Sequence, residues 1–111
     1  MRYGLEEMTI KKIDEVFSRF PEIREVILYG SRAMGTHKKG SDIDLVILSD
    51  KIELSTVYKI ERELDDLLLP YTIDLSVHRH IQNPNLLEHI KNVGTTFYSI
   101  QTKPNRFPKT F

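Results

Sequence analysis

The sequence predicts an α/β (α+β) protein in which a small mixed β-sheet is flanked by helices. Short runs rich in β-branched residues are interspersed with longer stretches in which apolar residues recur every three or four positions. The chain has 111 residues, of which 40% are hydrophobic and 29% charged. These are ordinary values for one globular domain, so we expect a single modest core.

The first two elements are a helix and a strand. Apolar residues recur at helical spacing between Thr9 and Pro21: Ile10, Ile13, Phe17 and Phe20. Pro21 is expected to end this helix. Residues 25–29 are too short and too β-branched for another helix and lead directly into Gly30, so they predict a buried strand.

A glycine-rich loop over residues 30–40 leads to a second strand in the apolar half of residues 41–48. A second helix is predicted from a Ser55 cap to Pro70. Its apolar stripe consists of Val57, Ile60, Leu64, Leu67 and Leu68. The run Leu67-Leu68-Leu69 is expected in the core.

Residues 71–77 alternate between apolar and polar, which predicts a third strand. Its two faces carry Ile73, Leu75 and Val77 on one side and Thr72, Asp74 and Ser76 on the other. A third helix is expected to begin at an Asn83 cap with Pro84 in the first helical position and to end at Gly94. Residues 1–100 then form the domain, and residues 101–111 a flexible or partner-binding tail.

Charge and composition exclude several classes of protein. Sixteen basic residues balance sixteen acidic ones, so no overall positive charge favours direct nucleic-acid binding. The absence of cysteine excludes disulfide frameworks, zinc fingers and thiol catalysis. Acidic residues near the start and the lack of a long apolar run argue against a signal peptide or membrane span, so we expect a cytoplasmic protein.

Three carboxylates are predicted to lie close together. Asp42 and Asp44 are two residues apart at the start of a strand and therefore point to the same face. A crossover through a helix usually returns the chain to a parallel neighbour, which would bring Asp74 beside them. Adjacent carboxylates repel one another unless a cation lies between them, and oxygen ligands select Mg²⁺ or Mn²⁺.

The turn that precedes these acids is suited to a phosphate. Gly30 allows close approach to the backbone, and a short helix beginning near Ser31 would point N–H groups and a hydroxyl at an anion. Arg32, Lys38 and Lys39 add local positive charge. Together with two metal ions, such a site is equipped for in-line attack of a hydroxyl on a nucleoside triphosphate.

The same residues resemble a family motif. Gly30-Ser31, ten intervening residues and Asp42-Ile43-Asp44, with Asp74 on a later strand, resemble the pattern of the DNA polymerase β-like nucleotidyltransferases. The resemblance covers residues 9–98 and implies the fold of that family. In size the chain is similar to the minimal nucleotidyltransferases, stand-alone domains commonly encoded beside a HEPN-domain protein as antitoxin and toxin.

The resemblance also implies roles and partners. Gly30 and Ser31 would hold the triphosphate of ATP, with Arg32 near it, while Asp42 and Asp44 bind two Mg²⁺ ions and the third acid, Asp74, shares one of them. The implied activity is transfer of AMP to a hydroxyl, by analogy a tyrosine, of a HEPN-type toxin in a hetero-oligomer. Two alternatives stay open: a nucleotide-binding antitoxin that blocks its partner sterically, and a nucleotidyltransferase acting on RNA or a small molecule.

Plainer interpretations stand beside these. The acids before the second strand can be turn residues, Asp74 can be solvated, and Arg32 can pair with an acid of the fold. Lys38 and Lys39 can be a solvated face of the loop. His78 and His80, two apart on an extension of the third strand, suggest zinc only weakly because no third ligand is evident. We assign no catalytic role to His37 or His89, and expect His89 to be a surface or partly buried residue of the third helix.

Overall fold

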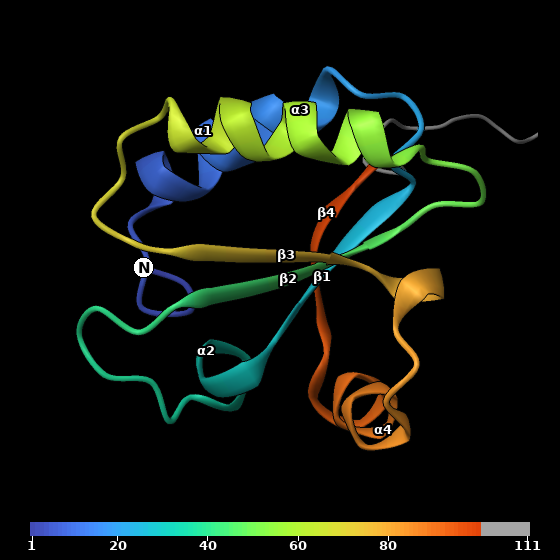
Figure 1. The fold of residues 1–111 in the computed structure, drawn as a ribbon. Coiled ribbons are helices and arrows are strands. Elements are labelled where there is room, and N and C mark those ends of the chain that lie inside the picture. Colours follow the sequence, from blue (N-terminus) through green and yellow to red (C-terminus); the bar gives the residue numbers. More distant parts are fainter. Residues whose placement is uncertain (101–111) are drawn as a thin grey trace, which may run out of the picture.

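A four-stranded mixed sheet organises residues 1–100, the part of the chain that the computed structural model describes (Figure 1). The strands are β1 (Glu25–Tyr29), β2 (Ile43–Leu48), β3 (Ile73–Val77) and β4 (Thr95–Ser99), in the spatial order β3-β2-β1-β4. β1 is antiparallel to both β2 and β4, whereas β2 and β3 are parallel. The predicted mixed sheet and the parallel return through a helix are therefore confirmed.

Helices cover both faces of the sheet. They are α1 (Glu7–Ser18), α2 (Gly30–Met34), α3 (Leu54–Asp65) and α4 (Pro84–Val93), with one 3₁₀ turn, η1 (His78–His80). α1 and α3 lie on one face, while α2 and α4 lie on the other (Figure 1). The predicted class, a small mixed sheet flanked by helices, is confirmed.

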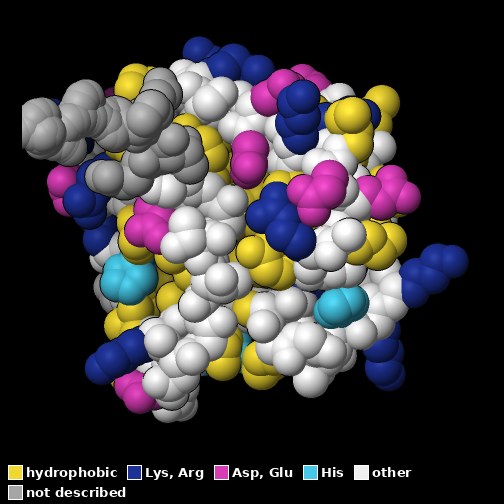
Figure 2. Space-filling view, turned by 180° about the vertical axis from the view of Figure 1, so that it is seen from behind, with side chains coloured by type: hydrophobic (Ala, Val, Ile, Leu, Met, Phe, Trp, Pro, Cys, Tyr) yellow, Lys and Arg dark blue, Asp and Glu magenta, His cyan; other side chains and the backbone are white. Residues whose placement is uncertain are grey.

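The surface carries both signs of charge. Acidic and basic side chains are interspersed over the face shown in Figure 2, in keeping with the formal net charge of zero. Within residues 1–100, no helix combines the length and the apolar character that a membrane span requires.

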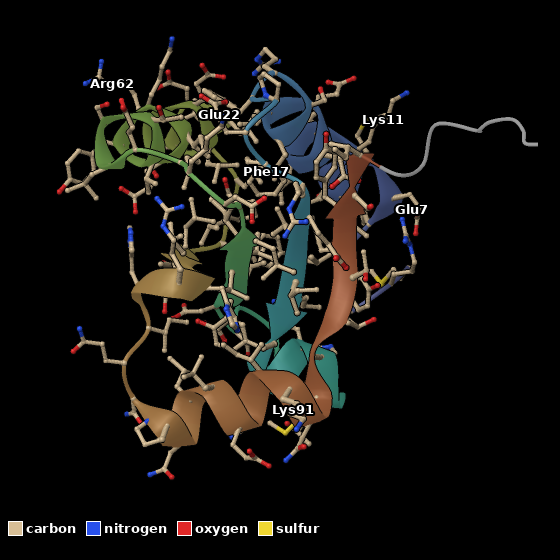
Figure 3. The ribbon with its side chains drawn as sticks, turned by 90° about the vertical axis from the view of Figure 1, so that its right-hand side faces the viewer. Glu7, Lys11, Phe17, Glu22, Arg62 and Lys91 are labelled. Carbon is tan, nitrogen blue, oxygen red and sulfur yellow. The ribbon has the colours of Figure 1, made fainter. Side chains whose placement is uncertain are left out.

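The main core lies between the sheet and the pair α1 and α3. Phe17 points from α1 toward the sheet and is fully buried (Figure 3). Alternation along β2 sends Ile43, Leu45 and Ile47 into this core and leaves Asp44 and Val46 on the opposite face. The face under α2 and α4 therefore holds a smaller apolar cluster and has room for polar groups.

β4 is a strand that the sequence analysis does not contain. Val26 pairs with Tyr98 and Ile27 with Thr96, so a β-bulge leaves Phe97 as an extra residue. The bulge places Phe97 and Tyr98 both against the main core, and the run therefore lacks the alternation by which strands are recognised.

The predicted extent of the second helix is wrong at both ends. α3 begins after Glu53, which makes no side-chain cap, instead of at Ser55. It ends at Asp65, and the chain then turns at Leu68, which has a φ of +54°. Leu68 is 87% exposed, so its predicted place in the core is wrong. Leu67 and Leu69 do pack against the main core, as predicted.

Other boundaries differ less. α1 starts at Glu7 and ends at Ser18, so Phe20 is buried beyond the helix. The Asn83 cap is confirmed, since its Oδ1 accepts from the Asn85 N–H at 2.8 Å. The predicted strand extension at His78 is instead the 3₁₀ turn η1. The tail predicted over residues 101–111 lies outside the described residues.

Candidate active site

Gly30 lies where β1 ends and α2 begins, at the edge of the site. Its φ of +74° is in the left-handed region, which favours glycine. A Cβ atom added here would collide with Oδ2 of Asp44. Backbone conformation and space thus both require glycine, and the short helix predicted near Ser31 is confirmed as α2.

Asp44 and Asp74 are cross-strand neighbours. They are register partners in the parallel pair of β2 and β3, so their side chains leave the same face of the sheet. Asp44 is half-buried, whereas Asp74 is exposed. Asp42 is also exposed and immediately precedes the strand.

The three carboxylates interact electrostatically. Burial, followed by the negative charges of Asp74 and Asp42, raises the pKa of the Asp44 carboxyl above its ordinary value. The positive charge of the Arg32 guanidinium acts in the opposite direction. A divalent cation bound here would offset the repulsion that these carboxylates exert on one another.

The side chains are near one another without forming a closed cage. No three His, Asp or Glu residues within residues 1–100 are arranged as a group that could hold a metal ion. The carboxylates nevertheless suit Mg²⁺, which typically takes one or two protein carboxylates and completes its shell with water and substrate phosphates. The predicted roles of Asp42, Asp44 and Asp74 as metal ligands stay predictions.

Arg32, predicted to lie near the triphosphate, is bonded to the backbone of the fold. Its side chain is buried, with 3% of its surface exposed, and donates to the backbone carbonyls of Tyr3 (2.8 Å) and Ser41 (3.1 and 2.8 Å). Its guanidinium also lies 4.9 Å from the centre of the Tyr71 ring. Arg32 thus ties the N-terminal turn to the residue before Asp42, and its contacts are with the fold instead of with open solvent where a phosphate would bind.

The lysines of the loop remain accessible. Lys38 and Lys39 are both exposed, and the Lys38 backbone N–H donates to the Ser41 hydroxyl at 2.8 Å. Ser31 is half-buried beside Gly30. The triphosphate contact of Ser31 stays a prediction, and the exposure of the two lysines fits both a solvated face of the loop and a source of positive charge.

His89 and Tyr29 border the site, although neither was predicted to have a role in it. His89 of α4 accepts a hydrogen bond at Nε2 from the Gly30 N–H (3.1 Å), and its ring meets that of Tyr29 edge-on with centroids 6.1 Å apart. His89 lies three residues after Leu86 and four before Val93, so helical spacing places it on the inner face of α4. This helical spacing is the feature of the sequence from which a position of His89 facing the sheet could have been predicted.

Comparison with known families decides the assignment. The family model described as "Polymerase beta, Nucleotidyltransferase" matches residues 11–103. The chain belongs to the polymerase β nucleotidyltransferase family. Nucleotidyl transfer is therefore its class of activity, and the family resemblance expected from the Gly-Ser and Asp-Ile-Asp motifs is confirmed. No curated protein matches the chain.

Solved structures share the fold of this nucleotidyltransferase. A toxin–antitoxin complex with AMP-PNP contains a chain with a TM-score of 0.64 and 24% identity, matched over 88% of this chain and 77% of that one. A complex of a tri-AMPylated Shewanella oneidensis HEPN toxin with its MNT antitoxin gives a TM-score of 0.63 and 19% identity, over 88% and 76%. At these identities the similarity establishes a common fold.

Proposed function

We propose that this nucleotidyltransferase moves AMP from ATP to a hydroxyl, by analogy a tyrosine, on a HEPN-type toxin and thereby acts as its antitoxin in the cytoplasm. The observation that carries the proposal is the contact between Gly30 and Asp44, with Asp74 paired beside them, in a chain of this family. It joins a turn suited to phosphate to the carboxylates that nucleotidyl transfer needs.

Residues of the chain have distinct tasks in this reaction. Gly30 and Ser31 hold the triphosphate so that its α-phosphorus faces the acceptor. The acceptor oxygen forms a bond to that phosphorus while the bond to pyrophosphate breaks, and Asp74 helps to accept the hydroxyl proton. Arg32 keeps Ser41, and through it Asp42, in position.

Two divalent cations, Mg²⁺ or alternatively Mn²⁺, are part of the proposal. Asp42 and Asp44 would hold one, and the three carboxylates together would share the other. When bound, such ions supply charge neutralisation on the triphosphate and acidify the attacking hydroxyl. The mutual repulsion at Asp44 supports this, since cations would relieve it.

The choice of partner follows from the relatives of known structure. Two of them are described as toxin–antitoxin complexes, one with an ATP analogue and one with an AMPylated HEPN toxin. The mixed charge of the chain is in keeping with a protein acceptor more than with an RNA acceptor. We therefore propose a hetero-oligomer with a HEPN-domain protein.

Intact-mass measurement tests the proposal against its alternatives. The chain, ATP, Mg²⁺ and the HEPN-domain protein encoded beside it are mixed, and a mass increase of the partner by whole AMP units is expected. The double variant Asp42→Asn/Asp44→Asn should abolish the increase, while the control Asp65→Asn/Asp66→Asn, at the end of α3, should retain it.

The remaining outcomes separate the alternative functions. An unmodified partner that still forms a stable complex with the chain and is neutralised by it would favour a steric antitoxin. If the partner is unmodified and forms no complex with the chain, the acceptor is RNA or a small molecule. Labelling with radioactive ATP would then identify that acceptor.

A further inference from the structure

The backbone N–H of Gly30 has an unusual partner. Gly30 is the first residue beyond the pairing of β1, whose last pair is Tyr29 with Asp44. Its N–H is therefore outside the strand ladder, and a buried N–H without an acceptor is costly. The acceptor is Nε2 of His89 at 3.1 Å, although the two residues are 59 positions apart in the sequence.

His89 is held in place from several sides. Its ring packs edge-on against Tyr29, which is itself 6% exposed. Its neighbour Ile90 belongs to the apolar cluster under α4, and the helix is anchored at its start by the Asn83 cap. The imidazole thus reaches the turn from a separate element, with its ring packed against Tyr29.

Gly30 is consequently fixed on two sides. The imidazole of His89 holds its N–H, and the Asp44 carboxylate packs so closely against its Cα that no Cβ fits. A rotation about the backbone bonds of this glycine would move the Ser31 hydroxyl relative to the Asp44 carboxylate. The imidazole contact opposes such a rotation and so helps to align these two groups.

We propose that His89 is a positioning residue of the nucleotide site: through its hydrogen bond to the Gly30 N–H it orients the Gly30-Ser31 turn for the triphosphate. This inference rests on the proposed use of ATP. It assigns to α4, which contains none of the motif residues, a direct part in nucleotide affinity.

Three substitutions separate the hydrogen bond from the bulk of the ring. His89→Leu keeps an apolar side chain against Tyr29 but removes the acceptor. His89→Gln places an amide oxygen near the position of Nε2, whereas the shorter His89→Asn does not reach it. His80→Leu, at an exposed residue of η1, serves as the matched control.

Calorimetric titration with AMP-PNP and Mg²⁺ measures the effect. Loss of one hydrogen bond predicts affinity about fivefold to tenfold weaker for His89→Leu and His89→Asn. His89→Gln and His80→Leu should stay within about twofold of the parent chain. Exchange of the Gly30 amide proton, followed by NMR without nucleotide, should accelerate in the Leu and Asn variants and not in the Gln variant.

The outcomes distinguish this inference from the proposed function. Equal affinity of His89→Leu and the parent chain would overturn the positioning role and leave the proposed function intact. A parent chain that does not bind AMP-PNP would overturn both. Weaker binding by His89→Leu without rescue by His89→Gln would show that the ring, and not the hydrogen bond, matters, and would also overturn the inference.

Discussion

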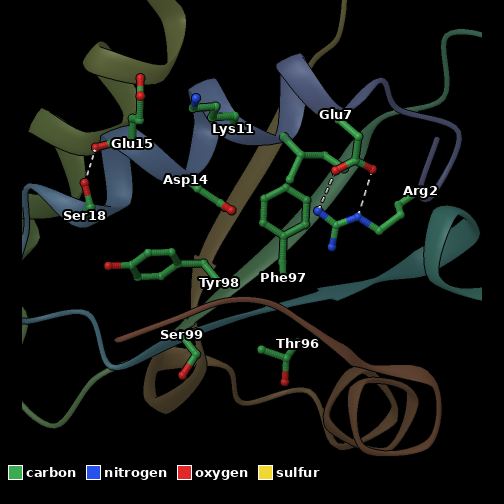
Figure 4. Close-up of a pocket in the computed structure, with 11 residues that line it drawn as sticks. Arg2, Glu7, Lys11, Asp14, Glu15, Ser18, Thr96, Phe97, Tyr98 and Ser99 are labelled. Atoms are coloured by element: carbon green, nitrogen blue, oxygen red, sulfur yellow. Dashed lines mark hydrogen bonds and ion pairs between the residues drawn. The ribbon is translucent and has the colours of Figure 1, made fainter. Parts of the chain in front are cut away.

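Asp14 offers a test of how burial controls the stability of this fold. The residue lies on α1 in a groove of about 590 Å³ between that helix and β4 (Figure 4). Its Oδ1 atom is buried and has no hydrogen-bond partner in the described structure. Burial raises the pKa of the Asp14 carboxyl from its ordinary value of 3.8 to about 6, against a smaller opposing effect of Arg2.

The sign and size of the effect follow from this pKa. Because the folded state holds the proton more tightly than the unfolded state, ionisation lowers the free energy of unfolding as the pH rises from 3.8 to about 6. The full difference in pKa would correspond to about 3 kcal/mol. Asp14 is only partly buried, so solvent screening reduces the expected cost to about 1 kcal/mol above pH 6.

The substitution Asp14→Asn removes the ionisation and keeps the shape. It should raise the free energy of unfolding by about 1 kcal/mol at pH 8, equivalent to about 4–8 °C in Tm for a domain of this size. The gain should fade as the pH falls toward 4. Circular dichroism melts across this pH range measure it, with Glu15→Gln on the same helix as control. A gain that is independent of pH, or a loss of stability at pH 8, would refute the reasoning.

Three further substitutions probe the Gly30 turn, the buried Arg32 and a helix cap. Gly30→Ala forces a left-handed conformation on alanine, at about 1–2 kcal/mol, and displaces Asp44; urea unfolding and AMP-PNP titration should both show losses, and normal nucleotide affinity would contradict the assigned site. Arg32→Lys keeps the charge but not the paired donors to two carbonyls, so we expect a loss of about 2 kcal/mol in urea unfolding; an unchanged midpoint would show that these bonds are dispensable. Asn83→Ala should lower stability by about 1 kcal/mol, with Asn83→Asp as the control that retains a cap.

The features that sequence predicts well here are local ones. Gly30 is recognisable because it follows the end of one short apolar strand, and the Asp42-Ile43-Asp44 run because it begins the next. Alternation assigns Asp74 and Ile73 to opposite faces. These predictions depend only on neighbouring residues and on the period of a strand.

Features that depend on tertiary contacts were not accessible in this way. The contact of His89 with Gly30 spans 59 positions, and the burial of Arg32 depends on carbonyls at Tyr3 and Ser41. Leu68 looks like part of a helical stripe until the chain turns at that residue. In each case a distant backbone group or a turn outweighs the local pattern.

The parallel register of β2 and β3 links folding to the readiness of the site. Side chains alternate with a period of two, so a slip of one residue between these strands would send Asp74 into the main core and turn Ile73 toward Asp44. Burying that carboxylate without a partner would cost several kcal/mol. Packing of the apolar face of β3 against the main core therefore selects the register in which Asp44 and Asp74 are paired. Formation of the core and formation of the carboxylate pair are the same step.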